Sequence, residues 1–363
     1  MTARDEALTV DRWTTMAPGR ALGAARQPTI HDVARLAHVS IGTVSKALNG
    51  NGRVSVETRA RVAAVAHKVG YRPNHLAQSL HRGQSFTVGV ISNDNFGRFA
   101  MPIVEGLEER LAERRISVFM CNATDDPALE ARHVEQLLAK RVDGIVVTGR
   151  RADRRPPLQV PLAGLPTLYV FSQTDDPEAL CLLPDDFGGA RLACDHLIKL
   201  GRRRIAHVTG PERFESVLLR REGYRAALKA AKLAAPEKIC LSGAWSEAWG
   251  REALDRLFAG GPAPDAVFCG NDQIARGVTE ALRERGLGAP ADVAVVGFDN
   301  WAVIAEATRP QLTSVDMNLK ELGRETGRRL MAMISGERQS GVHRLPCSLV
   351  IRESCGAMRQ GGA

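Results

Sequence analysis

Two clusters of polar side chains follow apolar runs that are typical of buried strands. Asn271 and Asp272 are the two residues after DAVFCG. Asp299, Asn300 and Trp301 are the three residues after VAVVGF. Ligands of open α/β sheets bind beyond the carboxyl ends of the strands, so these side chains are candidates for a binding site. Carboxylate and amide groups bind hydroxyl groups. A polar residue in this place also commonly caps the next helix, and Asn271 or Asp272 could do so for QIARGV.

The sequence shows no pattern of a known catalytic or metal centre beside these candidates. It contains no GxSxG, P-loop or HExxH motif. Its seven cysteines are scattered without the spacing of metal ligands, and we interpret them as reduced structural thiols. The adjacent acids Asp175-Asp176 and Asp185-Asp186 are more typical of turns than of acid–base chemistry. We therefore expect no catalytic residues, no metal and no cofactor.

The elements that would position the polar clusters alternate along the chain beyond Ser85. Helix-like stretches such as IVEGLEERLAERR and QIARGVTEALRERG separate short β-rich runs. This alternation predicts parallel sheets with helices on both faces, and there are enough units for two sheets side by side. The segment RRADRRPPLQVPLAGLP is expected to be a basic surface loop. The strand candidates are FTVGVIS, ISVFMCN, DGIVVTG, LPTLYVF, RIAHVTG, DAVFCGN and VAVVGFD.

A small all-α unit is predicted before the α/β part. Thr29 with Asp32 is close to a capping box for IHDVARLA, and Ser40 precedes a second short helix, IGTVSKAL. Ser55 and Gly70 are placed to begin and end a third helix. Apolar residues recur at helical spacing in all three segments. Two short helices joined by a tight turn and supported by a third form a helix-turn-helix unit.

Positive charge is concentrated in this unit. The segment 27–84 has eight Lys or Arg residues and two acids, so it carries +6 of the net charge of +8. This is typical of a DNA-binding domain, whose second helix presents its N-terminal residues to base edges in the major groove. Ile41 could contact a thymine methyl group and Lys46 a guanine edge, whereas Gly42 offers no side chain. The candidate base-reading residues are Ser40, Ile41, Gly42, Thr43 and Lys46.

The segment PTIHDVARLAHVSIGTVSKALNGNGRVSVETRARVAAVAHKVGYRPNHLAQSLHRGQS resembles the DNA-binding headpiece of the LacI/GalR family of bacterial repressors. The matching elements are DVA, VS.GTVSKALN, VS.ETR.RV, GYRPN and LAQSL, spaced as in the family. The resemblance implies a hinge helix from Asn74 that folds when two subunits meet on an operator. Ala77 would then lie in the minor groove, and Leu80 would wedge into the central base step. Candidate phosphate contacts are Thr29, Ser45, Asn49, Arg53 and Tyr71.

The resemblance also implies an effector site, because the α/β part of this family is similar to periplasmic sugar-binding proteins. Arg220 and Trp245 lie where the family has an effector-binding arginine and a covering aromatic ring. Together with Asn271 and Asp299 they indicate a sugar or polyol site: an amide and a carboxylate for vicinal hydroxyls, a guanidinium fork and an indole face. The weaker candidates, from the first lobe, are Asp94, Phe99 and Asp185.

The chain departs from the family pattern after its first strand. The usual Asn-Pro-Phe-Phe is replaced by Gly97-Arg98-Phe99-Ala100, which places Arg98 near the mouth of the cleft. The identity of the effector therefore does not follow from that of a relative. A sugar ranks first and a nucleobase or nucleoside second, because an indole ring also stacks on purines. A solute-binding protein with an incidental helical N-terminus is a third interpretation, and the intact headpiece and the missing signal peptide argue against it.

These features predict a cytoplasmic homodimeric repressor of carbohydrate-utilisation genes that binds a pseudopalindromic double-stranded operator. No apolar run approaches the ~20 residues that span a membrane, and no leucine heptads follow LVIRES. By the family analogy, the chain crosses between two lobes near Asp185, Asp316 and His343. The predicted divisions are a disordered extension 1–27, the helix-turn-helix domain 28–73, hinge and linker 74–85, the two-lobed domain 86–355 and a flexible tail 356–363. Lobe 1 comprises about 86–184 and 316–343, and lobe 2 about 185–315 and 344–355.

Overall fold

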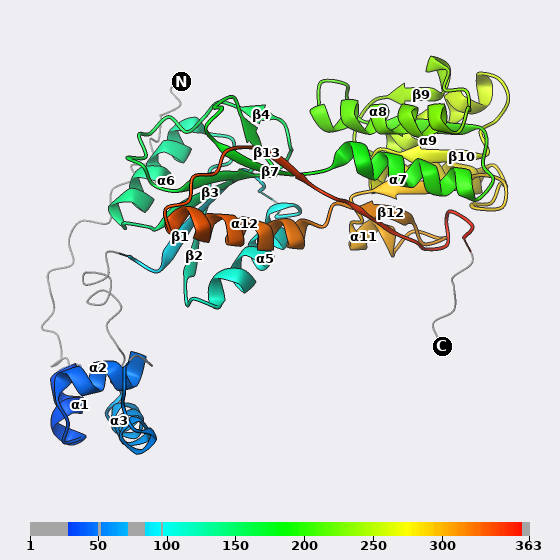
Figure 1. Cartoon of the computed structure of the whole chain (residues 1–363). Helices are drawn as coiled ribbons and strands as arrows, with labels where there is room; N and C mark the ends of the chain where they lie inside the picture. Colours follow the sequence, from blue (N-terminus) through cyan, green and yellow to red (C-terminus); the bar gives the residue numbers. More distant parts are fainter. Residues whose placement is uncertain (1–27, 50–51, 72–83, 96, 358–363) are drawn as a thin grey trace, which may run out of the picture. The chain divides into compact units, whose positions relative to one another are not determined.

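The computed structural model describes residues 28–49, 52–71, 84–95 and 97–357. The chain divides into two compact units, 1–82 and 83–363. The first is helical and the second is α/β (Figure 1), which confirms the predicted fold class. The predicted extension 1–27, the hinge residues 74–83 and the end of the predicted tail, 358–363, lie outside the described residues.

The described part of the first unit contains three helices: α1 (Ile30–Leu36), α2 (Ile41–Asn49) and α3 (Val56–Val69). Their ends follow from the capping residues. The backbone N–H of Thr29 donates to the Asp32 carboxylate at 2.9 Å, and the N–H of Thr43 donates to Ser40 Oγ at 3.1 Å. Ser55 caps α3, and Gly70 ends it with a φ of 70°. The buried core is formed by Val33, Ala34, Ala37, Val44, Ala47, Val62 and Ala66.

The second unit contains two six-stranded sheets, one in each lobe. The lobe 1 sheet has the order β13-β7-β5-β3-β1-β2, and all its pairings are parallel. The lobe 2 sheet has the order β14-β12-β11-β10-β8-β9, and only β14 is antiparallel. The lobe 1 strands are β1 (Thr87–Ser92), β2 (Ser117–Asn122), β3 (Gly144–Thr148), β5 (Thr167–Val170), β7 (Leu180–Pro184) and β13 (Gly341–Leu345). The lobe 2 strands are β8 (Ile205–Thr209), β9 (Cys240–Ser242), β10 (Ala266–Cys269), β11 (Ala294–Phe298), β12 (Thr313–Asp316) and β14 (Ser348–Val350).

Helices pack on these sheets in pairs, as expected for parallel strands joined by crossover connections. In lobe 1, α5 (Ala100–Ala112) packs against α12 (Leu319–Ile334), and α6 (Pro127–Ala139) contacts β1. In lobe 2, α7 (Asp186–Lys199) packs against α8 (Glu215–Ala230), and α9 (Glu247–Ala259) packs against α10 (Asp272–Glu284). The short α11 (Ala302–Ala305) contacts α10. A Cβ at Gly106 of α5 would overlap the backbone of α12, so glycine permits this close crossing.

Three segments connect the lobes (Figure 1). The first follows β7 at Asp185, and the second lies between β12 and α12. The third lies between β13 and β14, at Pro346 and Cys347. The prediction put this third crossing near His343, but β13 continues to Leu345 because its pairing with β7 extends to Pro184. The lobes are therefore joined near the carboxyl ends of several strands, where ligands of such folds bind.

All seven predicted strands are present in the structure. Five further strands of the two sheets, β7, β9, β12, β13 and β14, had not been predicted. They are only three to five residues long, and β9, β13 and β14 are half-buried rather than apolar runs. The predicted surface loop 150–166 contains β4 (Arg154–Arg155), which pairs with β6 (Gln173–Thr174), and Ala152 is buried.

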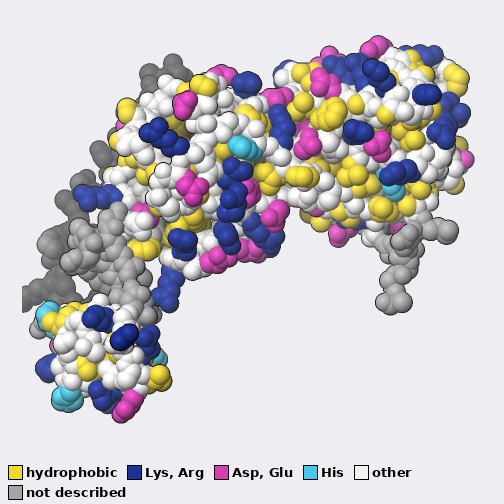
Figure 2. Space-filling model, viewed as in Figure 1, with side chains coloured by type: hydrophobic (Ala, Val, Ile, Leu, Met, Phe, Trp, Pro, Cys, Tyr) yellow, Lys and Arg dark blue, Asp and Glu magenta, His cyan; other side chains and the backbone are white. Residues whose placement is uncertain are grey.

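Charged side chains of both signs alternate on the face of lobe 1 formed by α5 and α12 (Figure 2). Lys320 bonds to Glu105 and Glu109 at 2.6 Å, and Arg324 bonds to Glu109 and Glu321 at 2.9 Å. Such exposed pairs add little stability individually, so the buried apolar contacts between the two helices hold them together. Among the described residues, no helix has both the length and the apolar character needed to cross a membrane.

Candidate functional site

The N-terminal end of α2 presents an exposed surface in the helical unit. Ile41 is 42% exposed, and Gly42 and Lys46 are also exposed. Ser40 and Thr43 are joined by a 2.9 Å hydrogen bond between their hydroxyl groups, so Ser40 both caps α2 and orients Thr43. On the face seen in Figure 2, Lys and Arg predominate over acidic side chains in this unit. The surface therefore has the charge and the accessible helix end that major-groove binding requires.

The predicted phosphate contacts have varied surroundings. Arg53 is exposed, whereas Thr29, Ser45 and Tyr71 are half-buried. The hydroxyl of Thr29 bonds to Asp32 at 2.8 Å, and partial burial raises the pKa of Tyr71. The side chain of Asn49 and the predicted minor-groove residues Asn74, Ala77 and Leu80 lie outside the described residues.

Gly42 offers a direct test of the base-reading surface. A Cβ at this position would meet only Ser40 Oγ, at 3.8 Å, so Gly42→Ala fits without strain. We expect the variant to unfold at slightly higher temperature, because alanine favours helix over glycine by up to about 1 kcal/mol. We also expect a changed base preference at one position of each DNA half-site, measured by sequencing DNA selected from a random library. Ala64→Ser, an exposed change on α3, should leave the preference unchanged. An unchanged preference in Gly42→Ala would show that residue 42 does not face a base.

A cavity of about 550 Å³ lies between the two lobes of the α/β unit. Six of the seven predicted effector residues line it: Asp94, Phe99, Arg220, Trp245, Asn271 and Asp299. Lobe 1 supplies Asp94 and Phe99 from the segment after β1, and lobe 2 supplies the others. The predicted site residues are thus brought together by the carboxyl ends of strands from both sheets.

Asp185, the seventh candidate, does not line this cavity. It is the N-cap of α7, and its carboxylate accepts from the N–H of Gly188 at 2.9 Å. The next residue, Asp186, lines the cavity instead and is only 1% exposed. At a helix start, successive side chains point in different directions, and the sequence pair Asp185-Asp186 does not reveal which one faces the ligand.

Arg220 organises the lobe 2 wall. Its Nε donates to Asp186 Oδ1 at 2.8 Å, and its guanidinium group also bonds to the carbonyl of Gly270. The Asp299 carboxylate lies 3.7 Å from the same group, which stacks 3.6 Å above the ring centroid of Phe298. Burial raises the pKa of Asp186, although Arg220 opposes this shift. Asp186 Oδ2 is buried without a hydrogen-bond partner among the described residues, so a ligand hydroxyl could donate to it.

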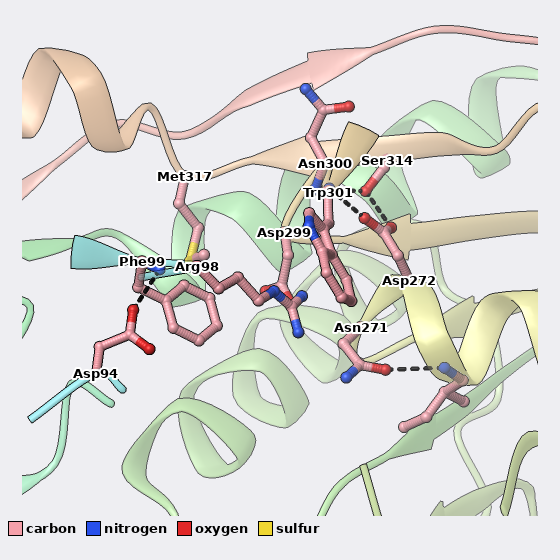
Figure 3. A network of polar contacts seen from close by, with 12 residues as sticks. Asp94, Arg98, Phe99, Asn271, Asp272, Asp299, Asn300, Trp301, Ser314 and Met317 are labelled. Atoms are coloured by element: carbon pink, nitrogen blue, oxygen red, sulfur yellow. Dashed lines mark hydrogen bonds and ion pairs between the residues drawn. The ribbon is translucent and has the colours of Figure 1, made fainter. Parts of the chain in front are cut away.

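Arg98 connects the lobes (Figure 3). From lobe 1 it forms an ion pair with Asp299 of lobe 2, and its guanidinium carbon lies 4.2 Å from the ring centroid of Trp301. The ring centroid of Phe99 is 4.8 Å away on the lobe 1 side. Asp299 has a φ of 94°, a backbone conformation that costs a non-glycine residue about 1–3 kcal/mol. The backbone of Asp299 is thus strained, and its carboxylate lies within reach of both Arg98 and Arg220.

Asn271 and Asp272 have different surroundings (Figure 3). The Asn271 side chain accepts from the N–H of Ile274 at 2.8 Å and so caps α10, as one of the two interpretations had it, while the residue also lines the cavity. Asp272 is fully buried and accepts from the Ser314 hydroxyl at 2.5 Å and the Trp301 N–H at 2.6 Å. Burial, together with the charge of Asp299, raises the pKa of Asp272 to about 7. Asp272 thus supports the Trp301 segment from behind the cavity.

Aromatic rings cover the apolar part of the cavity. Phe99 stacks on Phe171 at a centroid distance of 5.0 Å, and Phe214 stacks on Trp245 at 6.5 Å. Trp245 lies over Gly210, where a Cβ would overlap the indole ring. Glycine at this position therefore permits the ring to lie flat against the end of β8, leaving a face for a ligand ring.

Several lining residues had not been predicted as effector contacts. Arg98 was expected only near the cleft mouth, and Trp301 was noted only as following a strand. Arg151 lies in the segment predicted to be a surface loop, and its basic composition gave no indication that it reached the cavity. The others are Arg150, Ala152, Phe171, Asp186, Phe214, Ser216 and Gln273.

Two family models match the chain. One describes bacterial regulatory proteins of the lacI family and covers residues 29–74, and the other describes a periplasmic binding protein-like domain and covers residues 194–355. Curated relatives include the HTH-type transcriptional regulator CelR of Thermobifida fusca, 35% identical over 91% of this chain and 98% of that protein. The ribose operon repressor of Escherichia coli (strain K12) is also 35% identical, over 81% of this chain and 89% of the repressor.

Solved structures give the same result over most of the chain. A transcriptional regulator CelR–cellobiose complex is 32% identical with a TM-score of 0.63, covering 90% of this chain and 99% of that one. The lac repressor dimer bound to operator and the anti-inducer ONPF is 29% identical with a TM-score of 0.70, covering 92% and 100%. These matches extend over both the helix-turn-helix unit and the two-lobed domain of this chain. The chain therefore belongs to the lacI family of bacterial regulatory proteins and is a DNA-binding transcriptional regulator.

Proposed function

We propose that this regulator represses transcription by binding an operator through α2, and that a sugar held in the cavity between the lobes changes its operator affinity. The observation that carries the proposal is the construction of the cavity from both lobes, joined across it by Arg98 and Asp299. A ligand that contacts both lobes stabilises one relative arrangement of them over others. Coupling of about 1–3 kcal/mol between the two sites would change operator affinity roughly 5- to 150-fold.

Polar groups beside aromatic rings support a sugar effector. Asp186 has an unpartnered buried oxygen, and Arg220 and Asn271 line the same wall. Trp245 provides a ring face for sugar C–H groups. The CelR relative has been solved with cellobiose, and another relative is named a ribose operon repressor. Carbohydrate-utilisation genes are therefore the first candidates for regulation.

A nucleobase or nucleoside effector is the second candidate. The stacked pairs Phe99–Phe171 and Phe214–Trp245 could accept a planar ring, and Asp299 could accept hydrogen bonds from ring N–H groups. A relative that is 31% identical over 90% of this chain is the repressor PurR of Haemophilus influenzae (strain PittEE). Direct titration with sugars and with purines separates the two candidates.

The regulator is proposed to act as a homodimer on a pseudopalindromic site. The lac repressor, which is similar over 92% of this chain, has been solved as a dimer on its operator. Two-fold protein symmetry then requires two half-sites of related sequence. We further infer that the cavity binds its ligand without converting it. Of the three buried acids that line it, Asp186 and Asp299 are each paired with a guanidinium group, and Asp94 accepts from two backbone N–H groups, so none is free to act as a general base.

Selection of DNA from a random library tests the proposal. We would incubate the purified protein with the library at two salt concentrations and sequence the DNA that is retained. We expect a near-palindrome with a flexible central step and binding that weakens steeply with salt. The selection is then repeated with sugars and with purines, which identifies a corepressor if one is needed. Failure to recover any motif under all these conditions would contradict operator binding.

A further inference from the structure

The charges lining the cavity do not balance at one end. Arg98 pairs with Asp299, Arg220 with Asp186, and Arg150 with Asp125 at 2.9 Å. Arg151 also lines the cavity, but no carboxylate among the described residues lies within 4.0 Å of its guanidinium group. Arg151 instead contacts an aromatic ring: its guanidinium carbon lies 4.7 Å from the centroid of the Phe214 ring.

A second unpaired arginine reaches the same ring from the other lobe. Arg151 follows β3 of lobe 1, whereas Arg213 and Phe214 follow β8 of lobe 2. The guanidinium carbon of Arg213 lies 4.5 Å from the Phe214 centroid, and Arg213 likewise has no ion pair within the described part of the chain. Burial, followed by the charge of Arg150, lowers the pKa of Arg151, whereas Asp153 and Asp125 oppose this shift more strongly than Arg213 adds to it. Arg213 is exposed and does not line the cavity, so of these two arginines Arg151 is the one that faces a ligand held there.

The neighbouring acids are already engaged. Asp153 accepts from the N–H of Glu215 at 2.9 Å, and Glu215 bonds to Arg344 at 2.9 Å. Asp94, which also lines the cavity from lobe 1, accepts from the N–H groups of Phe99 and Ala100 at 2.7 and 3.0 Å, so it caps α5. None of these carboxylates forms an ion pair with Arg151.

We propose that the effector is an anion, with a carboxylate or phosphate group bound at Arg151 and a hydroxylated or ring body against Trp245, Arg220 and Asn271. This rests on the proposed function, because it describes the ligand of the same cavity. An anionic group at Arg151 of lobe 1, on a ligand whose body contacts lobe 2, adds an attraction across the lobes. Guanidinium groups bind carboxylate and phosphate through paired N–H donors, so both chemistries fit. Effector charge would then contribute to closing the cavity.

Inorganic phosphate is the first probe, because it has the anionic group and lacks the hydroxylated or ring part of the proposed ligand. Calorimetric titration of the full-length protein at constant ionic strength should show saturable binding in the millimolar range. In Arg151→Gln the affinity should fall roughly tenfold or more, as expected for loss of a charge-assisted hydrogen-bond pair. Arg154→Gln is the matched control: this arginine is nearby and exposed, pairs with Asp175 at 3.1 Å and does not line the cavity. Absence of saturable binding, or equal binding by both variants, overturns the proposal.

Matched ligands distinguish carboxylate from phosphate and separate this inference from the proposed function. The panel is glucose, gluconate, glucuronate and glucose 6-phosphate, with adenine as a purine without an acidic group. Tighter binding of either anionic class than of glucose, lost in Arg151→Gln, supports the inference and identifies the group. A neutral ligand that binds Arg151→Gln as well as wild type and shifts operator affinity overturns the inference but leaves the proposed function intact. An anion that binds through Arg151 without changing operator affinity contradicts the proposed function instead.

Discussion

Replacing Arg220 by methionine should abolish the effector response and lower the free energy of unfolding by about 3–5 kcal/mol, the usual cost of removing one partner of a buried ion pair. The Arg220 and Asp186 side chains are only 6% and 1% exposed. Methionine keeps most of the length of the side chain but supplies no donor for Asp186 or for the Gly270 carbonyl. Asp186 would remain buried with no cation in contact, and Asp299 would keep only Arg98.

Two further variants separate the loss of the charge pair from loss of the binding group. In the double variant Arg220→Met/Asp186→Asn, most of the lost stability should return, because no unpaired carboxylate remains buried. Effector binding should stay absent, because the guanidinium donors are still missing. Arg221→Met is the matched control on the next residue of α8: its partner Glu212 is 59% exposed, so the cost should stay below about 1 kcal/mol.

Urea unfolding and ligand titration of the four proteins measure both effects. The prediction fails if Arg220→Met is no less stable than Arg221→Met, or if the double variant binds effector like wild type. The first result would mean that the buried pair contributes no stability. The second would mean that Arg220 does not contact the effector.

Local sequence patterns predicted most of the fold. The capping residues Thr29, Ser40 and Ser55 and the left-handed Gly70 act within a few residues of themselves, so the helix ends could be placed without tertiary information. The central strands are continuous apolar runs because helices cover both faces of a parallel sheet. β13 and β14 lie at the sheet edges, where partial exposure removes that signal. Their places depend on pairing with β7 and β12, which are distant in the sequence.

The residues that line the cavity could be predicted where they follow strand ends. They could not be predicted where contacts between the lobes bring them to the cavity. Asp299 directly follows β11, and Asn271 follows β10 with only Gly270 between, so topology alone directs both to the cavity. Asp185 was chosen over Asp186 because nothing local shows which of two adjacent acids caps the helix. Arg151 was interpreted as part of a surface loop, since only the approach of Phe214 from the other lobe brings it to the cavity wall. Charge balance across lobes is a property of the folded chain, and sequence spacing does not report it.

Stability should fall as pH rises between about 4 and about 7, because of Asp272. Burial raises the pKa of this carboxyl from its ordinary value of 3.8 to about 7 in the folded protein. Below pH 4 both the folded and the unfolded chain hold the proton, so Asp272 contributes no pH dependence. Between the two pKa values only the folded chain holds it, and each pH unit removes about 1.4 kcal/mol of stability. Above about pH 7 the proton is lost from both states, and the stabilising contribution is gone.

Asp272→Asn tests this directly. The amide has nearly the shape of the protonated acid: its oxygen can accept from the Trp301 N–H, and its nitrogen can donate to Ser314 Oγ. The free energy of unfolding of the variant, minus that of wild type, should therefore rise by roughly 2–3 kcal/mol between pH 5 and pH 8. Urea unfolding followed by tryptophan fluorescence suits the measurement, because Trp245, Trp249 and Trp301 all lie in lobe 2.

Asp195→Asn provides the reference for general pH effects, since this residue lies on α7 and is paired with Arg191 at the surface, 37% exposed. Its stability should follow that of wild type at both pH values. If the stability of Asp272→Asn also follows that of wild type, the Asp272 carboxylate is ionised throughout this range, and its hydrogen bonds to Ser314 and Trp301 and the charge of Arg98 offset its burial. If only Asp272→Asn diverges, a neutral carboxyl group holds the Trp301 segment at neutral pH and below. The contact of Trp301 with Arg98, which joins the two lobes, would then weaken as the pH rises above 7.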